Sequence, residues 1–269
     1  MSSKPHYLGS EYSNRFKDPS LVEVYHLRSP YPAAIFEMLT GLITDEPRAV
    51  LDVGCGTGNI ARSLVHLVER VDAVDFSLPM IEKGRSLPGG DHPNLNWIHG
   101  RAEDAPLNPP YALVTAGQAL HWMDWEIVLP RFREALTPRG YLAIVDTREL
   151  PFPWAAELGK IIKRFSTNPD YQPVDLIKEL EMRRLFHQLG EKKTAPVSFV
   201  QNIDDYVESF HSMSSLSRQR MTADMASAFD DEVRELVSRF CPANRVAMQV
   251  VGTIIWGRPE SAKKTGENV

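Results

Sequence analysis

The stretch Ala49–Asn59, with the sequence AVLDVGCGTGN, decides the fold of this chain. Small and apolar residues surround Asp52 and run directly into Gly54, Gly56 and Gly58, which predicts a buried strand that ends in a tight turn. The residues that follow space their apolar side chains for one face of a helix. Glycine permits positive φ and lets the backbone approach a ligand closely. The sequence therefore predicts a strand, glycine turn and helix that cradle a cofactor.

The charge around this turn indicates which cofactor it holds. A dinucleotide site places a pyrophosphate at a helix N-terminus and usually spaces its glycines G-x-G-x-x-G, whereas the spacing here is G-x-G-x-G. Asp52 stands two residues before the first glycine, where a carboxylate would repel a pyrophosphate but suit an ammonium group. Asp75 follows Gly54 by 21 residues, close to the ~20-residue offset of an acid that binds ribose. The two acids favour S-adenosylmethionine over NAD.

In combination, three motifs resemble the class I S-adenosylmethionine-dependent methyltransferases. LDVGCGTG (51–58), VDAVDFS (71–77) and HGRAEDAPL (99–107) are similar to the branch with UbiE-like and trans-aconitate-methyltransferase-like members. The run TAGQALHWMDW (115–125) resembles the second of these, and the resemblance covers about residues 25–145. It implies an α/β fold, with a Rossmann-like, doubly wound sheet of seven strands, mostly parallel with the last antiparallel, and an α-helical lid.

The resemblance also implies a set of cofactor-binding residues. They are Asp52, Gly54, Cys55, Gly56, Gly58, Asp75, Phe76, Met80, Ala102, Glu103, Gln118, Arg28 and Tyr12. Phe76 and Met80 are expected to flank the adenine, or else to be simple core residues. Relatives commonly carry an aspartate before the alanine of the third motif, but this chain has Arg101 there. The adenine contact therefore falls to the backbone of Ala102 and to Glu103.

An aromatic segment leads to the first expected helix, over residues 33–43. Its run YHLRSPYP (25–32) looks like the corresponding segment of the resembling families. By that analogy Arg28 meets the methionine carboxylate, and Tyr12 or Tyr25 closes over the cofactor. The alternative for these tyrosines is ordinary packing within a surface arm.

The substrate pocket is expected at the carboxyl end of the fourth strand, because ligands of open parallel sheets bind there. Gln118, His121 and Trp122 would border it, and Tyr25 and Trp154 would complete it. His121 is the candidate catalytic residue, since a histidine can take a proton from a substrate or donate a hydrogen bond to it. The alternative is a histidine that caps or packs a helix.

A single methyltransferase domain with five parts is expected. They are an N-terminal arm (1–34), a cofactor-binding core (35–150), a helical lid insertion (151–193), final strands and helices (194–258) and a flexible tail (259–269). The lid is expected to hold helices over 155–166 and 174–189, and the last two strands are expected at 197–200 and 246–256.

Composition excludes several other classes. The net charge of −5 and the pI of about 5.9 show no excess of basic residues of the kind that nucleic-acid-binding proteins carry. The NPPY run at 108–111 matches a motif of enzymes that methylate adenine or glutamine amides, but it precedes its strand where theirs follows it. No apolar run approaches the ~20 residues of a membrane span. The two cysteines are too few for a disulfide framework, and the histidines show no paired ligand spacing. We expect a cytoplasmic monomer or homodimer with no metal.

The chemistry of the cofactor suggests the reaction. A sulfonium methyl is already activated, so transfer needs in-line placement of a nucleophile, exclusion of water and at most one base. The trans-aconitate-like resemblance favours a small-molecule acceptor with a carboxylate or hydroxyl oxygen. The alternatives are C- or N-methylation of a natural-product intermediate, or a protein that binds the cofactor without methyl transfer.

Overall fold

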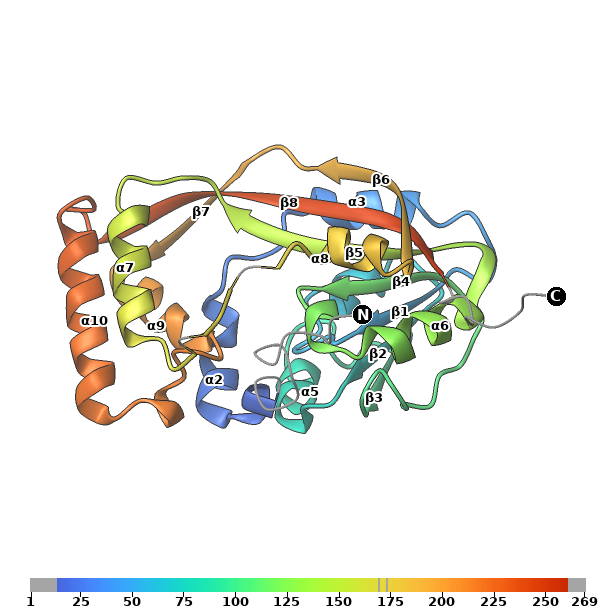
Figure 1. Ribbon diagram of the computed structural model, residues 1–269, viewed down its shortest axis with the longest axis horizontal. Coiled ribbons are helices and arrows are strands. Elements are labelled where there is room, and N and C mark those ends of the chain that lie inside the picture. Colours follow the sequence, from blue (N-terminus) through green and yellow to red (C-terminus); the bar gives the residue numbers. More distant parts are fainter. Residues whose placement is uncertain (1–13, 169, 173, 261–269) are drawn as a thin grey trace. The chain divides into compact units, whose positions relative to one another are not determined.

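The computed structural model describes residues 14–168, 170–172 and 174–260 (Figure 1). These residues form two compact units, each built from segments that are separate in the sequence. Unit 1 takes its described residues from 14–32, 147–172 and 195–251, and unit 2 takes its own from 33–146, 174–194 and 252–260. The expected boundaries after residues 34, 150 and 193 lie within four residues of unit boundaries, and the division into five parts of a single domain stays a prediction.

One sheet contains all the strands. They are β1 (Ala49–Val53), β2 (Arg70–Asp75), β3 (Leu95–His99), β4 (Tyr111–Gly117), β5 (Leu136–Glu149), β6 (Phe186–Lys193), β7 (Val197–Asn202) and β8 (Arg245–Pro259). The order is β3-β2-β1-β4-β5-β8-β6, and the neighbours from β3 to β5 are parallel. Both β6 and β7 pair antiparallel with β8, through its residues 253–259 and 245–250 respectively. The α/β fold is confirmed, with eight strands in the described ranges where seven were expected.

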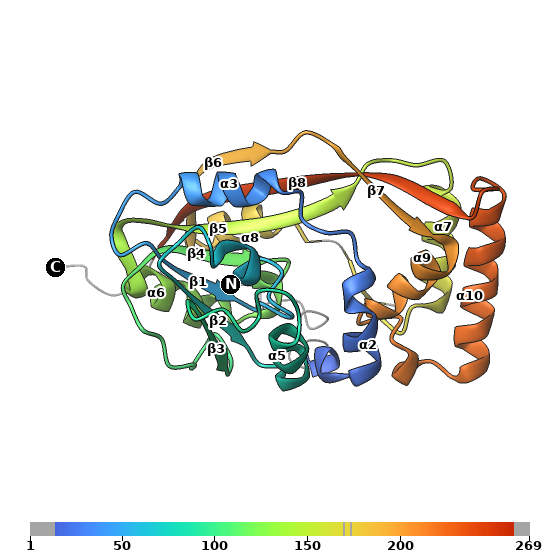
Figure 2. The ribbon, with the colours of Figure 1, turned by 180° about the vertical axis from the view of Figure 1, so that it is seen from behind.

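Helices cover both faces of the sheet in unit 2. They are α3 (Ala34–Gly41), α4 (Ala61–Leu64), α5 (Leu78–Arg85), the 3-10 helix η4 (Leu120–Trp122), α6 (Trp125–Ala135) and α8 (Leu176–Met182). Figure 1 shows α6 and α8 on one face, and Figure 2 shows α3 on the other. Every residue of β1 is buried, because the strand lies between β2 and β4 and beneath helices. This burial explains its unbroken run of small and apolar residues.

The helix expected over 174–189 is wrong in its second half. The helix α8 ends at Met182, Arg184 takes a positive φ of 56°, and the chain then forms β6 as an edge strand of the sheet. Gly190 is required in β6, because a Cβ there would lie 2.3 Å from the ring of Trp256 on β8. The strand is missed because most of its residues are exposed and its last three are charged, which leaves no alternating apolar face.

Helices make up most of unit 1, together with β7 and the first part of β8. They are η2 (Asn14–Lys17), α2 (Pro19–Val24), η3 (Tyr25–Leu27), α7 (Ala155–Phe165), α9 (Ile203–Ser209), η5 (Phe210–Ser212), η6 (Arg218–Arg220) and α10 (Ala223–Ser238). The helices α7 and α10 lie side by side (Figures 1 and 2). Phe229, Val233 and Leu236 of α10 are fully buried in the core of this unit. Across the described ranges, no helix combines the length and the apolar character that a bilayer span needs.

Candidate functional site

The glycine turn of unit 2 adopts a conformation that other residues tolerate poorly. Gly54, Gly56 and Gly58 have φ values of 63°, 56° and 77°. A Cβ on Gly54 would lie 2.5 Å from the Cβ of Ala119, and one on Gly58 would lie 2.5 Å from the ring of Trp97. The turn therefore packs tightly against the segment after β4 and against β3, as well as adopting the left-handed backbone that glycine favours.

Asp75 ties this turn to the start of α5. The side chain is 6% exposed at the end of β2, and its two oxygens accept hydrogen bonds from the backbone N–H groups of Gly56 and Ser77, both at 2.8 Å. Burial raises the pKa of Asp75, and these two hydrogen bonds oppose the rise. Because a carboxylate oxygen accepts more than one hydrogen bond, Asp75 retains the capacity to accept from a sugar hydroxyl. The Ser77 side chain accepts from the N–H of Met80, so Ser77 is the N-cap of α5.

Asp52 lies on β1 inside the sheet, and its carboxylate contacts the N-terminus of α4. It is 1% exposed, and its carboxylate accepts from the Thr115 hydroxyl at 2.8 Å and from the N–H of Ala61 at 3.2 Å. Burial raises the pKa of Asp52 to about 7, against the lowering effect of both hydrogen bonds. The N-terminus of a helix binds anions, so this carboxylate takes the place that a bound phosphate would fill. Thr115 was missed, although a polar residue within an apolar strand is itself a signal.

Cys55 has no features of a nucleophile. It is half-buried within the glycine turn, and its N–H donates to the carbonyl of Val74 on β2 at 3.1 Å. Desolvation raises the pKa of its thiol well above the usual range, so the sulfur stays protonated near neutral pH. Its place in the turn is consistent with a backbone role.

An arginine that was not predicted holds the loop after β3. Arg131 of α6 donates to the carbonyls of Ala102 and Ala105 at 2.9 and 2.8 Å. Glu103 accepts from the N–H of Asp124, the N-cap of α6, at 2.8 Å. The loop after β3, which is expected to contact the adenine, is therefore held to α6 by hydrogen bonds from the Arg131 side chain and by a hydrogen bond to the Glu103 side chain. The long-range partner Arg131 had no local sequence signal, because it stands 26 to 29 residues along the chain.

The two residues expected beside the adenine differ in exposure. Met80 is only 2% exposed in the core beneath α5. Phe76 is half-buried, and the guanidinium of Arg101 lies 5.9 Å from the centre of its ring. The role of each beside an adenine stays a prediction.

The carboxyl end of β4 carries a strained glutamine. Gln118 has a φ of 50°, and it donates from its backbone to the carbonyl of Val145 at 3.0 Å and from its side chain to Asp146 at 2.9 Å. His121 and Trp122 follow in η4, half-buried, with ring centres 4.7 Å apart. Strained backbone of this kind clusters at functional sites. The structure thus gathers these residues in the unit that also holds the glycine turn, Asp52 and Asp75.

The remaining expected site residues belong to unit 1 or lie outside the described residues. Arg28 donates to the hydroxyl and to the carbonyl of Ser212, both at 2.8 Å, and its guanidinium lies 4.5 Å from the ring centre of Tyr25. Trp154 is 4% exposed in the core of unit 1 and donates to the Tyr206 hydroxyl at 3.1 Å. Its surroundings are those of a core residue, and its place in a substrate pocket stays a prediction. Tyr12 lies outside the described residues.

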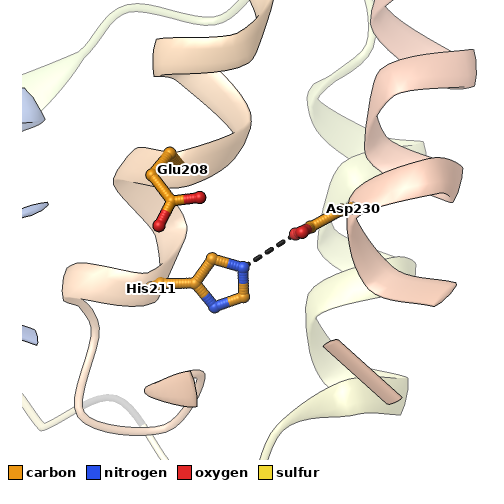
Figure 3. A group of neighbouring side chains, drawn as sticks. All are labelled: Glu208, His211 and Asp230. Carbon is orange, nitrogen blue, oxygen red and sulfur yellow. Dashed lines mark hydrogen bonds and ion pairs between the residues drawn. The ribbon is translucent and has the colours of Figure 1, made fainter. Parts of the chain in front are cut away.

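Unit 1 also contains a cluster of titratable side chains (Figure 3). Ligand atoms of Glu208, His211 and Asp230 lie within 4.8 Å of one another. Arg218 donates to Glu208 at 2.5 Å and to Asp230 at 2.9 Å, so a guanidinium already supplies the positive charge that a metal ion would bring. The sequence-based expectation of no metal stays a prediction.

Comparison with known proteins agrees with this geometry. Residues 50–140 match the family model described as a methyltransferase domain. An uncharacterised methyltransferase of Mycobacterium tuberculosis is 34% identical over 139 residues, which cover 51% of this chain and 54% of the relative. The trans-aconitate 2-methyltransferase of Azoarcus sp. BH72 is 30% identical over 136 residues, which cover 45% of this chain and 52% of the relative. The chain thus spans about half the length of these curated relatives.

Solved structures show the same fold. A protein of Anaeromyxobacter dehalogenans, provisionally assigned as a type II methyltransferase, gives a TM-score of 0.61 at 24% identity, covering 86% of this chain and 96% of that one. A phosphoethanolamine N-methyltransferase of Haemonchus contortus, solved with S-adenosylhomocysteine, gives a TM-score of 0.52 at 13% identity, covering 93% of this chain and 59% of that one. Residues 50–140 therefore resemble a methyltransferase domain, and the chain has the fold of these methyltransferase structures.

Proposed function

We propose that the chain transfers a methyl group from S-adenosylmethionine to a carboxylate or hydroxyl oxygen of a small organic molecule. One observation carries the choice of cofactor. The two backbone positions at which a dinucleotide-binding protein would hold a pyrophosphate both donate to carboxylates of this chain. The N–H of Ala61 at the start of α4 donates to Asp52, and the N–H of Gly56 donates to Asp75. A pyrophosphate would find both N–H groups already donating to carboxyl oxygens of this chain.

The same carboxylates fit the parts of S-adenosylmethionine. Asp75 stands at the end of β2, where an acid accepts hydrogen bonds from ribose hydroxyls. A nearby ammonium would favour the charged form of Asp52, which burial alone disfavours. The carbonyl of Ala102 accepts from Arg131, so the N–H of Ala102 is the backbone group we assign to the adenine edge. Phe76 and Met80 would pack on the adenine, and Gln118 would border the methionine part.

The residues of the chain have a limited chemical task. When bound, S-adenosylmethionine supplies a methyl group that its sulfonium already activates. The protein must orient the acceptor in line with this group and exclude water. A carboxylate acceptor carries its nucleophilic charge already and needs no base. A hydroxyl acceptor must lose a proton, and His121, three residues after Gln118, is the candidate to remove it.

Names of the curated relatives support an oxygen acceptor. One is a malonyl-[acyl-carrier protein] O-methyltransferase of Halalkalibacterium halodurans, 34% identical over 105 residues, which cover 36% of this chain and 38% of the relative. The trans-aconitate 2-methyltransferase is a second. Malonyl groups and aconitate are both carboxylic acids, so we rank carboxylates first among the acceptors.

A panel assay tests the proposal. S-adenosylhomocysteine release is measured with carboxylic acids, phenols and amines, and cofactor binding is measured separately by calorimetry. Release with acids or phenols is expected. Release with amines alone would replace oxygen by nitrogen as the acceptor atom, and binding without any release would indicate a cofactor-binding protein. His121→Gln should lower turnover of phenols and leave that of acids unchanged, since only a hydroxyl needs a base.

A further inference from the structure

An arginine of α4 joins the glycine turn to a second loop of unit 2. Arg62 donates through Nε to the carbonyl of Thr57 at 2.9 Å and through Nη2 to Oδ1 of Asn59 at 3.0 Å. Its Nη1 donates to the carbonyl of Pro88 at 2.8 Å, in the loop that leads from α5 to β3. Because the guanidinium is planar and its N–H groups have fixed directions, these contacts hold the turn and the loop in one arrangement.

The carbonyl of Thr57 is enclosed between Arg62 and α5. Thr57 is 4% exposed, and a Cβ added to Gly84 of α5 would lie 2.8 Å from the carbonyl oxygen of Thr57. A buried carbonyl that loses its donor carries the full cost of its desolvation. Burial also lowers the pKa of Arg62, although an arginine stays charged at physiological pH. The hydrogen bond to Thr57 is therefore charge-assisted and is made in a partly desolvated place, which strengthens it.

The same stretch of chain makes contacts with both buried acids. The N–H of Gly56 donates to Asp75, and the N–H of Ala61 donates to Asp52. The residues that Arg62 binds in the turn lie between these two points. The stretch from Gly56 to Ala61 is therefore held at each end by an acid that we expect to bind the cofactor, and in the middle by a guanidinium.

A bound cofactor would draw on the oxygens of the same two acids. Asp75 would accept from a ribose hydroxyl as well as from Gly56, and Asp52 would accept from an ammonium as well as from Ala61. The acids then divide their hydrogen bonding between the backbone and the ligand, whereas Arg62 serves the backbone alone. A turn that Arg62 already fixes loses less conformational entropy when the ligand binds, and this preorganisation increases affinity.

We propose that Arg62 is a positioning residue, which keeps the turn between Gly56 and Ala61 in the conformation that binds the cofactor. The inference rests on the proposed function for the identity of that ligand, which is S-adenosylmethionine or its product. Loss of the guanidinium should free the turn and leave α4 in place, because Ala61 and Leu64 are fully buried and hold the helix against the core.

Calorimetry on the full chain with S-adenosylhomocysteine tests the inference. Arg62→Met removes every N–H donor of the side chain, so it should weaken binding roughly tenfold or more, as expected for the hydrogen bonds lost within the turn. Arg62→Lys should restore part of the affinity, because an ammonium is a point charge without the planar fork. Arg85→Met is the matched control, since Arg85 is exposed on α5, and it should bind as the native chain does.

A double variant tests whether Arg62 acts through the turn. Asn59→Ala removes the contact between Asn59 and Arg62 but leaves the one between Arg62 and Thr57, so it should weaken binding less than Arg62→Met. The double variant should bind no more weakly than Arg62→Met alone, because both changes remove the same contact. Losses that simply add would overturn the inference.

Amide hydrogen exchange separates positioning from a general loss of stability. The amide of Gly56 lies in the turn, whereas Leu51 lies in the middle of β1, a strand whose residues are all buried. In Arg62→Met the Gly56 amide should exchange roughly tenfold faster, while the Leu51 amide keeps its native rate. Equal acceleration at both amides would give Arg62 a purely structural role and overturn the inference.

The outcome for the native chain separates this inference from the proposed function. If the native chain binds S-adenosylhomocysteine and Arg62→Met binds it equally well, the inference is overturned and the proposed function stands. If the native chain does not bind it, the proposed function fails and the inference fails with it. If Arg62→Met does not fold, Arg62→Lys decides: weaker binding with a native exchange rate at Leu51 supports the inference, and native affinity overturns it.

Discussion

At the scale of single residues, the site depends on two buried carboxylates that each accept a backbone N–H. Asp75 accepts from Gly56 and Ser77, so it organises the turn as well as offering oxygens to a ribose. Asp52 accepts from Thr115 and Ala61, so it joins β1 to β4 and to the start of α4. A substitution at either acid therefore acts on local order and on ligand binding together.

Asp75→Ala should weaken binding of S-adenosylmethionine by about 1.5–3 kcal/mol, roughly ten- to a hundredfold in Kd, because hydrogen bonds to a charged group are lost. Titration calorimetry measures the change. Asp91→Ala is the control, since this aspartate is exposed in the turn before β3. Equal affinity of native chain and Asp75→Ala would refute the ribose assignment.

Asp52 should make stability fall as pH rises. Its pKa is about 7 in the folded chain and near 4 when unfolded, so between these values the folded state holds a proton that the unfolded state has released. Ionisation of Asp52 therefore does not lower the free energy of unfolding below about pH 4. Between about pH 4 and pH 7 it lowers this free energy progressively, by up to about 4 kcal/mol. Urea unfolding of the native chain and of Asp52→Asn at pH 4.5, 6 and 8 measures the difference. As pH rises, the free energy of unfolding of the native chain should fall relative to that of Asp52→Asn. A difference that stays constant with pH would contradict a raised pKa of Asp52.

Local chemistry explains which residues were predictable. The glycine turn was predictable because its residues are consecutive in the sequence, whereas the roles of Asp52 and Asp75 toward a cofactor stay predictions. Partners such as Arg131 and Arg218 were not found, because their contacts are tertiary and polar. In the sequence, an arginine that donates to distant carbonyls or carboxylates has the same helical spacing as one whose side chain is solvated.

At the scale of elements, the glycine turn works because its backbone fits between β3 and the segment after β4. Gly54 meets Ala119, and Gly58 meets Trp97. Close approach and positive φ coincide at both glycines, so the turn has two reasons to exclude a side chain. This packing holds the ends of β1, β3 and β4 in one arrangement.

Gly54→Ala should destabilise the chain by about 2–5 kcal/mol, the sum of a left-handed backbone and an overpacked contact. Gly41→Ala is the matched control, because Gly41 ends α3 and an added Cβ would meet nothing within 4 Å. That change should be neutral or stabilising by up to about 1 kcal/mol. Thermal unfolding measures both, and S-adenosylhomocysteine binding should be lost only in Gly54→Ala. Similar melting temperatures would show that the turn accommodates a side chain.

Element prediction succeeded where burial imposes a period. The helix α7 begins at the expected residue 155 and ends one residue before the expected 166, and β8 extends the expected range 246–256 by one residue at its start and three at its end, because each carries a clear apolar pattern. The strand β6 was taken as part of a helix, since only Phe186 among its residues is buried. The pairing that forms it comes from β8, about 70 residues later, and leaves little trace in the local pattern.

At the scale of the whole molecule, each compact unit draws on three separate segments of the chain. A linear division into arm, core, lid and final strands has no means of anticipating this, because β5 and β8 each contribute residues to both units. Composition is more informative at this scale. The net charge of −5 is a sum over the whole chain, so it can be read from the sequence without knowing the fold, and it disfavours long-range attraction of polyanions such as nucleic acid.

The acidic balance predicts that the chain does not bind nucleic acid. Counterion release drives nonspecific binding, and it requires clustered lysine and arginine residues that outnumber the acids facing the phosphates. The chain has 30 basic and 35 acidic residues. Fluorescence anisotropy with a labelled single-stranded RNA, in low salt and again near physiological salt, should show no saturable change at micromolar protein. A dissociation constant of order 1 μM that weakens steeply with salt would contradict this prediction. It would also reopen RNA as a methyl acceptor, because a local basic surface would then outweigh the net charge.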